Sequence, residues 1–379
     1  MSARYGRGLL CLAAAVDLPG CFDAGPYVEL VRLAERGGLD FVTLDDSSTR
    51  PGPAALAVLS RAAPATRRIG LVPTVVTAPT GPNAPTAPPG PFRAQAAVAT
   101  LDWVSRGRAG WRIEVSAGED EARPFGRRRT APAAALGDEA GEVTEAPTAV
   151  TAVTAVTEAT DVTVKPRDGR ADGAGSRDVP AVRLLDRDRP HRADFTGGDL
   201  LAGGASTVPR PPHGHPVRVV DATGSRARTV AARHADVALI RAATPAHAAA
   251  VRDELRTRAA ACGRDPDTLR TLVSLLIDLG DGEYAAEPGH GGGGPRPTAR
   301  GPLYRGGPVD LAELVAGWYA DGVTDGFHLR PVEPRRDLER LVNGTVALLQ
   351  HRGLFRTFYP GGTLREHLGL ARPTKGTDG

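Results

Sequence analysis

The sequence predicts an α/β protein folded as a (β/α)8 barrel, in which eight parallel strands alternate with helices. Short, almost wholly apolar runs recur along the chain, as expected for parallel strands buried on both faces. Stretches with one apolar face separate these runs and fit crossover helices. The chain has 379 residues, of which 41% are hydrophobic, and this suffices for one large core. Eight strand candidates favour a closed barrel over an open sheet.

The first half of the chain supplies four of the expected strands. Its first helix has one apolar face and ends at the pair Gly37-Gly38, a typical helix stop. The apolar run LDFVTL that follows is too short for a helix and fits a buried strand. The expected strands are 8–16, 39–44, 68–76 and 111–116, and the expected helices are 27–37, 53–63 and 92–105.

The second half of the chain resumes the alternation at residue 215. The run HPVRVVDATGS is expected to form a strand that ends in a Thr/Gly/Ser loop. A long helix further on is ended by Gly263. The expected strands are 215–225, 236–240, 268–280 and 326–331, and the expected helices are 226–235, 246–262, 311–321 and 335–352.

Two segments depart from the alternation. Residues 145–164 follow a three-residue Thr-Ala-Val rhythm that suits neither helix nor strand, and the polar, Gly-rich stretch 165–178 comes next. We therefore expect a low-order insertion at about 127–180 within a single barrel domain that spans 1–379. The Gly- and Pro-rich stretch 281–307 is expected to be a flexible loop.

Composition and charge exclude several classes of protein. The net charge is +3 and no basic run is interleaved with aromatic residues, so we expect no nucleic-acid partner. No apolar stretch reaches about 18 residues, so we expect no membrane partner. The three cysteines and nine histidines show no metal-ligand spacing, and we expect no metal site. Sparse, odd cysteine usage fits a cytoplasmic location.

The fourth expected strand and the turn before it carry polar residues in a regular pattern. Residues 106–110 are expected to form a helix-to-strand turn, with Arg106 and Arg108 facing solvent. Side chains alternate between the two faces of a strand. We expect Trp111, Ile113 and Val115 to pack under the helices, and Arg112, Glu114 and Ser116 to line the lumen, where Arg112 and Glu114 partly neutralise each other. A polar face at the carboxyl end of a barrel strand indicates a site.

Several stretches together resemble one known family. The sequences LAERGGLDFVTLDDS, RIGLVPTVV, FRAQAAVATLDWVSRGRAGWRIEVS, DGFHLRP and HRGLFRTFYPGGTLREHLGL are similar to those of the bacterial luciferase-like flavin-dependent monooxygenases. The branch that includes nitrilotriacetate and long-chain alkane monooxygenases is the most similar. The resemblance implies a barrel that binds FMN at the carboxyl ends of its strands, since the cofactor performs the redox chemistry while the protein orients it.

The resemblance also implies an activity and partners. Such enzymes receive reduced FMN from a separate flavin reductase, form a flavin peroxide with dioxygen and oxidise a small organic substrate. A homodimer in the cytoplasm is expected on the same ground. Two alternatives stay open, a deazaflavin-dependent oxidoreductase and a non-catalytic or flavin-free barrel. The second is favoured by a shortened segment after the first strand and by the Thr-Ala-Val tract that replaces the helix after the fourth strand.

The resemblance implies a set of flavin-contacting residues on the first four strands. Asp46 follows the second strand and is either a flavin contact or a helix cap. Thr74 faces the pocket or bonds its own backbone. Arg112 replaces an asparagine that contacts the flavin ring in the relatives. It is expected either to contact the flavin ring itself or to form an outward ion pair with a glutamate. Ser116 matches the serine that ends this strand in the family.

The remaining candidates lie on the second half of the barrel. Thr223, Gly224 and Ser225 stand at the family's phosphate loop, where backbone N–H groups at a helix start suit an anion; the alternative is a simple turn with a cap. His328 stands where relatives have asparagine. It is a candidate for a catalytic proton donor, and a packed core histidine is the alternative.

Overall fold

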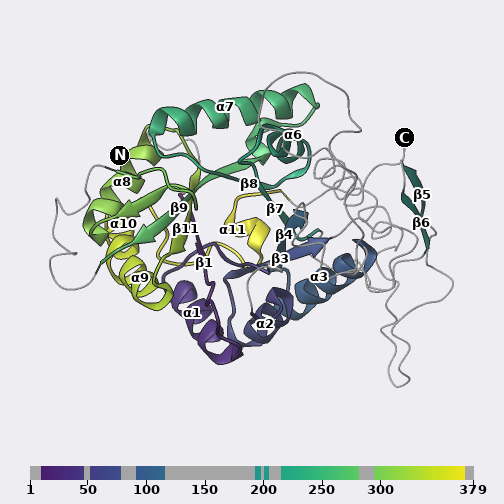
Figure 1. The fold of residues 1–379 in the computed structure, drawn as a ribbon, viewed down its shortest axis with the longest axis horizontal. Coiled ribbons are helices and arrows are strands. Elements are labelled where there is room, and N and C mark those ends of the chain that lie inside the picture. Colours follow the sequence, from purple (N-terminus) through teal and green to yellow (C-terminus); the bar gives the residue numbers. More distant parts are fainter. Residues whose placement is uncertain are drawn as a thin grey trace.

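Eight parallel strands close into a barrel, which confirms the predicted fold class (Figure 1). The structure is a computed structural model that describes residues 10–46, 52–77, 91–115, 193–197, 200–204, 215–280 and 294–371. The strands follow the order β1-β2-β3-β4-β7-β8-β9-β11, and β11 pairs with β1 to close the ring. They are β1 (Cys11–Ala15), β2 (Phe41–Leu44), β3 (Gly70–Thr77), β4 (Gly110–Val115), β7 (Val217–Asp221), β8 (Val237–Ile240), β9 (Arg270–Asp278) and β11 (Gly326–Pro331). All eight expected strands are therefore present.

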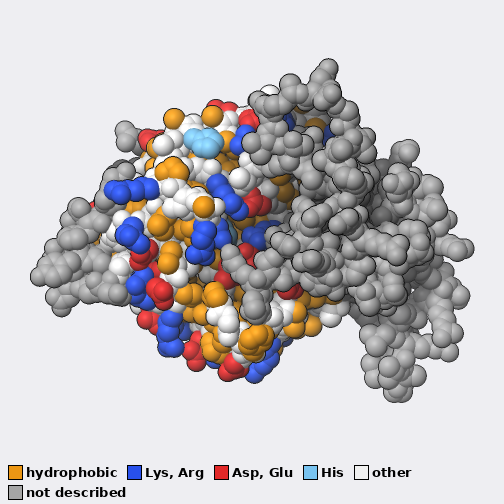
Figure 2. All heavy atoms as spheres, in the orientation of Figure 1, with side chains coloured by type: hydrophobic (Ala, Val, Ile, Leu, Met, Phe, Trp, Pro, Cys, Tyr) orange, Lys and Arg blue, Asp and Glu red, His pale blue; other side chains and the backbone are white. Residues whose placement is uncertain are grey.

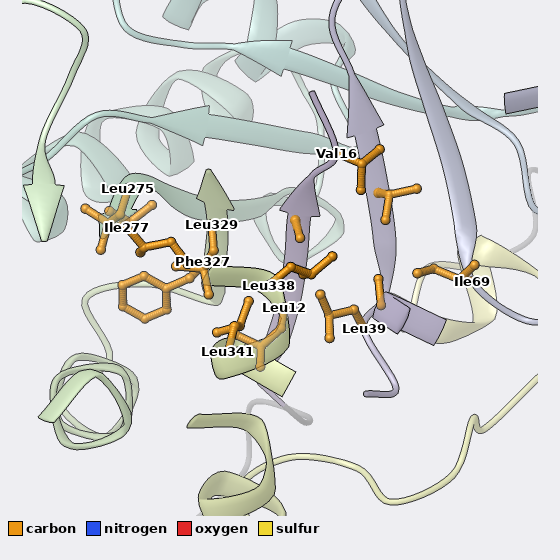
Figure 3. Close-up of a cluster of buried hydrophobic side chains, with 14 of the residues drawn as sticks. Leu12, Val16, Leu39, Ile69, Leu275, Ile277, Phe327, Leu329, Leu338 and Leu341 are labelled. Atoms are coloured by element: carbon orange, nitrogen blue, oxygen red, sulfur yellow. The ribbon is translucent and has the colours of Figure 1, made fainter. Parts of the chain in front are cut away.

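Helices surround the barrel and cover the outer faces of the strands (Figure 1). They are α1 (Ala24–Arg36), α2 (Ala55–Ala62), α3 (Pro91–Ser105), α6 (Ser225–His234), α7 (Pro245–Ala261), α8 (Pro308–Ala320) and α9 (Pro334–Arg340). Apolar side chains from the strands and helices form the larger core between the two layers, part of which Figure 3 shows around Leu12, Phe327 and Leu341. Figure 2 shows basic and acidic side chains interspersed over the described part of one face.

The expected helix 335–352 is divided by a π-helical segment. The helix α9 continues into π-helical residues Leu341–Val346 and then into α10 (Ala347–His351). Within this segment, a Cβ added to Gly344 would lie 2.6 Å from the Cβ atom of Pro308, and the Thr345 hydroxyl donates to the carbonyl of Pro308 at 2.8 Å. A π-bulge lets the chain follow this close contact with α8, which the sequence periodicity did not reveal.

Short elements lie outside the expected alternation. Strand β10 (Leu303–Arg305) pairs with the end of β9, so the stretch 281–307 is not a loop throughout. Strands β5 (Ala193–Gly197) and β6 (Leu200–Gly204) form an antiparallel hairpin that the sequence analysis did not predict. The expected insertion at 127–180 lies outside the described residues, and so does the stretch 281–293.

A second, smaller core fills the amino half of the barrel lumen. The inward side chains of the strands pack there with leucines of the C-terminal segment around α11 (Leu364–His367), which lies at the centre of the ring in Figure 1. Gly70 admits this segment, since a Cβ there would come within 2.6 Å of the Leu364 side chain. Because apolar side chains close the amino end, the carboxyl end is the side where a ligand would enter.

The turn between α3 and β4 corrects one expectation and confirms another. Trp111 is buried among apolar side chains outside the lumen, as predicted. Arg106 is exposed, but Arg108 is only 3% exposed, so the prediction that both arginines face solvent was wrong for Arg108. Its guanidinium group turns inward and donates to backbone carbonyls of the α2–β3 connection and to the Thr66 hydroxyl.

Candidate functional site

Polar side chains form a ring at the carboxyl end of the lumen, directly above the inner core. The strand positions that enter the inner core fix which face points inward, and the next inward positions along the strands are polar. We call this set the polar ring. It comprises Thr43, Thr74, Arg112, Asp221, Arg241, Ser274, His328 and Arg330, together with Asp17 and Asp45, which follow β1 and β2.

His328 lies between Thr43 and Ser274 in the polar ring and is 1% exposed. Its Nε2 atom lies 2.8 Å from the Thr43 hydroxyl and its Nδ1 atom 3.1 Å from the Ser274 hydroxyl. Strand β1 runs between β2 and β11 and presents only the small residues Ala13 and Ala15 there, so Thr43 and His328 can meet. Burial, reinforced by nearby arginines, lowers the pKa of His328 to about 3, so the imidazole is neutral at pH 7.

We expect acid to destabilise the protein through His328, and His328→Gln to remove this part of the acid sensitivity. The pKa of His328 is about 3 in the folded state and about 6.5 in the unfolded chain, so stability is lost as the pH falls below 6.5. Between pH 7 and pH 5 the wild type should lose about 2 kcal/mol more unfolding free energy than the variant. Urea unfolding at both pH values measures the difference; parallel pH profiles would contradict it.

Asp45 joins two of the predicted site residues. Its Oδ1 atom accepts from the Thr74 hydroxyl at 3.1 Å and forms an ion pair with Arg112. Burial acts to raise the pKa of Asp45, but Arg112, Arg330 and the Thr74 hydroxyl together hold that pKa below its usual value. Arg112 is thus paired with Asp45, which follows β2. Glu114 was its expected partner, and the side chain of Glu114 is not among those that the structure describes. Arg112 faces the lumen, as the alternation predicted, and Thr74 faces it too, as the resemblance implied.

Asp17 is a second carboxyl group at the same edge. Its Oδ1 atom accepts from the backbone N–H of Asp45 at 2.8 Å. Burial, together with the negative charge of Asp45, raises the pKa of Asp17 to about 6. A carboxyl group with such a pKa can take up or release a proton near neutral pH. The mouth of the lumen therefore holds a proton-exchanging group.

Asp46 faces a different environment from its neighbour Asp45. Its carboxylate accepts from the backbone N–H of Ala55, at the start of α2, at 3.4 Å. Burial raises the pKa of Asp46. The N-cap of α2 is Ala54, so Asp46 is not the capping residue itself, although it accepts from the first turn of the helix. The structure places Asp45, not Asp46, between Thr74 and Arg112. Because side chains alternate, Asp45 is in phase with the inward Thr43, a signal that the sequence already contained.

The loop from β7 to α6 presents the start of a helix at the rim. Thr223 bonds to Asp221 through its backbone N–H at 3.1 Å and also through its hydroxyl. Gly224 is the N-cap of α6, and no described side chain accepts a hydrogen bond from the first turn. Arg258 donates to the carbonyl of Ser225 at 3.2 Å, and its charge is paired with the carboxylate of Glu254 at 2.7 Å. The N–H groups of this turn suit an anion.

Sequence reasoning missed seven members of the polar ring. Three of them are Thr43, Asp221 and Ser274, and the other four are Asp17, Asp45, Arg241 and Arg330. Arg241 forms an ion pair with Asp221 at 3.0 Å, across the ends of β8 and β7. Each of the four lies at or just after the carboxyl end of an expected strand, and this position could have identified them. Ser116 lies outside the described residues.

The fold and the site together define a class of protein. A parallel barrel with a closed amino end and titratable groups around its carboxyl mouth is a TIM-barrel enzyme. A family model described as luciferase-like monooxygenase matches residues 12–305, and the chain belongs to this family. Its members are flavin-dependent monooxygenases. No helix among the described residues is long and apolar enough to cross a membrane.

Comparisons with individual proteins agree with the family. The chain is 29% identical to nitrilotriacetate monooxygenase component A of Aminobacter aminovorans, covering 92% of this chain and 90% of that protein. The structure of EDTA monooxygenase from Chelativorans sp. BNC1 superimposes with a TM-score of 0.77 at 18% identity, covering 96% and 99% of the two chains. The coenzyme F420 dependent tetrahydromethanopterin reductase from Methanopyrus kandleri gives 0.61 at 16% identity, covering 90% and 99%. These two structural likenesses concern the fold.

Proposed function

We propose that this protein is a monooxygenase that uses reduced FMN and dioxygen to oxidise a small organic substrate at the polar ring. The observation that carries the proposal is the first turn of α6, which no described side chain caps, beside a ring of hydrogen-bond donors in a chain of the luciferase-like family. The turn suits a phosphate and the ring suits a polar heterocycle. The two lie at the same end of the barrel.

The phosphate of FMN would lie at residues 223–225. Among the described residues, no side chain caps the N–H groups at the start of α6, and these groups favour an anion together with the partial positive charge of the helix end. Arg258 reaches Ser225 from α7, but its charge is paired with Glu254, so the assignment depends on the backbone N–H groups and the helix end. The residues in this loop therefore fit the charged end of FMN.

The flavin ring would lie over the polar ring near β3 and β4. Thr74 and Arg112 are hydrogen-bond donors that could orient ring carbonyl groups. Reduced FMN, when bound, would supply the two electrons needed to place one oxygen atom of dioxygen on the substrate and to release the other as water. The inner core below keeps water out, while Asp17 can hold or release a proton at its carboxyl group.

The partners of the proposed enzyme follow from the same chemistry. A separate flavin reductase would supply reduced FMN, which the name of the relative, component A, supports. A homodimer and a cytoplasmic location remain proposals from the sequence. As a second candidate, a deazaflavin would replace FMN. The likeness in fold to a coenzyme F420 dependent reductase favours it over other cofactors.

Anaerobic titration with reduced FMN tests the proposal, and Ser225→Asp tests the phosphate loop. We expect the wild type to bind reduced FMN, and the variant to bind it at least about tenfold more weakly, because a carboxylate would face the phosphate. Thr244→Asp is the matched control, since it adds the same charge at the N-cap of α7. It should keep wild-type affinity.

Each outcome of the titration separates one part of the proposal from another. Unchanged affinity in Ser225→Asp would refute the phosphate loop while leaving the flavin in place. Binding of coenzyme F420 in preference to reduced FMN would favour the second candidate. If the wild type binds neither reduced FMN nor coenzyme F420, the flavin-free barrel is the hypothesis that remains.

A further inference from the structure

Arg330 is a half-buried arginine of the polar ring, and no carboxylate in the described part of the chain pairs with it. It lies at the carboxyl end of β11, two residues after His328, and therefore faces the same way. Among the described residues, its one hydrogen bond runs from Nη1 to the carbonyl oxygen of Arg300 over 3.4 Å, near the limit for such a bond. Within the described residues, Arg330 forms no ion pair.

Other arginines at this end of the barrel are paired with carboxylates. Arg112 pairs with Asp45 and Arg241 with Asp221. The pattern extends to β9, where the carboxylate of Asp278 accepts from two guanidinium groups, those of Arg305 at 2.9 Å and Arg336 at 2.7 Å. Arg330 thus differs from its neighbours in having donors that are not engaged by an acidic side chain.

The surroundings of Arg330 compensate its buried positive charge only in part. Burial lowers the pKa of Arg330, because the charged form loses water, while Asp45 and Asp17 act in the opposite direction. Asp45 already accepts from Arg112 and Thr74, and Asp17 accepts from the backbone of Asp45. A guanidinium group in this state gains most from a planar anion that can accept two parallel hydrogen bonds.

We infer that Arg330 binds a carboxylate group of the substrate, and that the substrate is therefore a small carboxylic acid in its anionic form. The inference rests on the proposed function, because it assigns the substrate class of that site. The phosphate of FMN is not the expected occupant. The loop proposed for it follows β7, and β8 and β9 separate β7 from β11 around the ring.

Carboxylate binding can be measured directly on the full-length protein, with and without reduced FMN. The probes are acetate, malonate and succinate, each compared by calorimetry with its neutral amide, namely acetamide, malonamide and succinamide. We expect the wild type to bind at least one carboxylate at least tenfold more tightly than the matching amide. Arg330→Gln should abolish this preference, and Arg330→Lys should retain part of it, since lysine keeps the charge without the planar fork.

Controls separate this inference from folding and from the flavin. Arg335→Gln removes an exposed arginine of α9 and should keep the wild-type preference. Arg330→Gln should keep the wild-type melting temperature and reduced-FMN affinity. A wild type without carboxylate preference, or a preference that survives in Arg330→Gln, overturns the inference. Loss of FMN affinity in Arg330→Gln would also overturn the inference. Failure of the wild type to bind FMN would instead reject the proposed cofactor, and the comparison of carboxylates with amides would still decide the role of Arg330.

Discussion

Arg108→Met is expected to lower the free energy of unfolding by about 4 kcal/mol. The Arg108 side chain is buried and makes five hydrogen bonds with oxygen atoms of Ala63, Thr66, Ile69 and Ser105, at 2.8 to 3.2 Å. Methionine fills the volume of the stem but donates no hydrogen bond, so buried carbonyl groups would lose their partners. Urea unfolding with a comparison of midpoints and slopes measures the loss.

Arg106→Gly is the matched control for this substitution. Arg106 lies in the same turn, is exposed and has a φ of 60°, a conformation that glycine adopts without strain. We expect its effect to stay within about 1 kcal/mol in either direction. A loss of less than 1 kcal/mol in Arg108→Met would contradict the buried arrangement of that side chain.

The positions of the eight strands could be predicted because each depends on local sequence. A run such as LDFVTL at 39–44 is apolar, short and bounded by polar or glycine residues, and these features decide its structure without reference to distant parts. The burial of the Arg108 side chain depends instead on residues about 40 positions earlier in the chain. Its partners Ala63 and Thr66 lie on the α2–β3 connection, and nothing in the local pattern RGRAG indicates them.

The candidate site could be predicted in position but only partly in composition. The rule that barrel enzymes use the carboxyl ends of strands pointed to the rim and to Arg112, and the resemblance to a family added Thr74 and His328. The structure places all three in the polar ring, and their role in binding stays a prediction. The resemblance to a family pointed to Asp46, whereas the contacts with Thr74 and Arg112 belong to Asp45. A sequence shows which residue types stand at the rim, but their pairing depends on closure of the ring.

Closure of the amino end of the barrel also could not be predicted from any single segment of the sequence. Asp40, just before β2, is fully buried, and its carboxylate forms an ion pair with Arg356, about 300 residues later in the chain. The same carboxylate accepts from the backbone N–H of Leu12 at 2.7 Å. This pair therefore ties the C-terminal segment to β1 and β2, opposite the candidate site.

We expect Asp40→Ala to lower the free energy of unfolding by about 3–5 kcal/mol, because it leaves a buried guanidinium group without its carboxylate. Arg356 is 6% exposed, and its Nε and Nη1 atoms already have no hydrogen-bond partner among the described residues. Arginine cannot shed its charge by deprotonation. Asp40→Ala should therefore unfold at a lower urea concentration than the wild type at every pH between 5 and 8.

Arg356→Met is expected to be less harmful than Asp40→Ala, and less harmful in acid than in base. Burial already raises the pKa of Asp40 even though Arg356 acts to lower it, so the carboxyl group left by Arg356→Met can become neutral by binding a proton. Stability held by a group with a raised folded-state pKa is present at low pH and is lost as the pH rises through that pKa. Urea unfolding of both variants at pH 5 and pH 8 checks this asymmetry. Equal losses in the two variants, with the same dependence on pH, would show that the two members of the pair are interchangeable and that protonation of Asp40 does not relieve the loss.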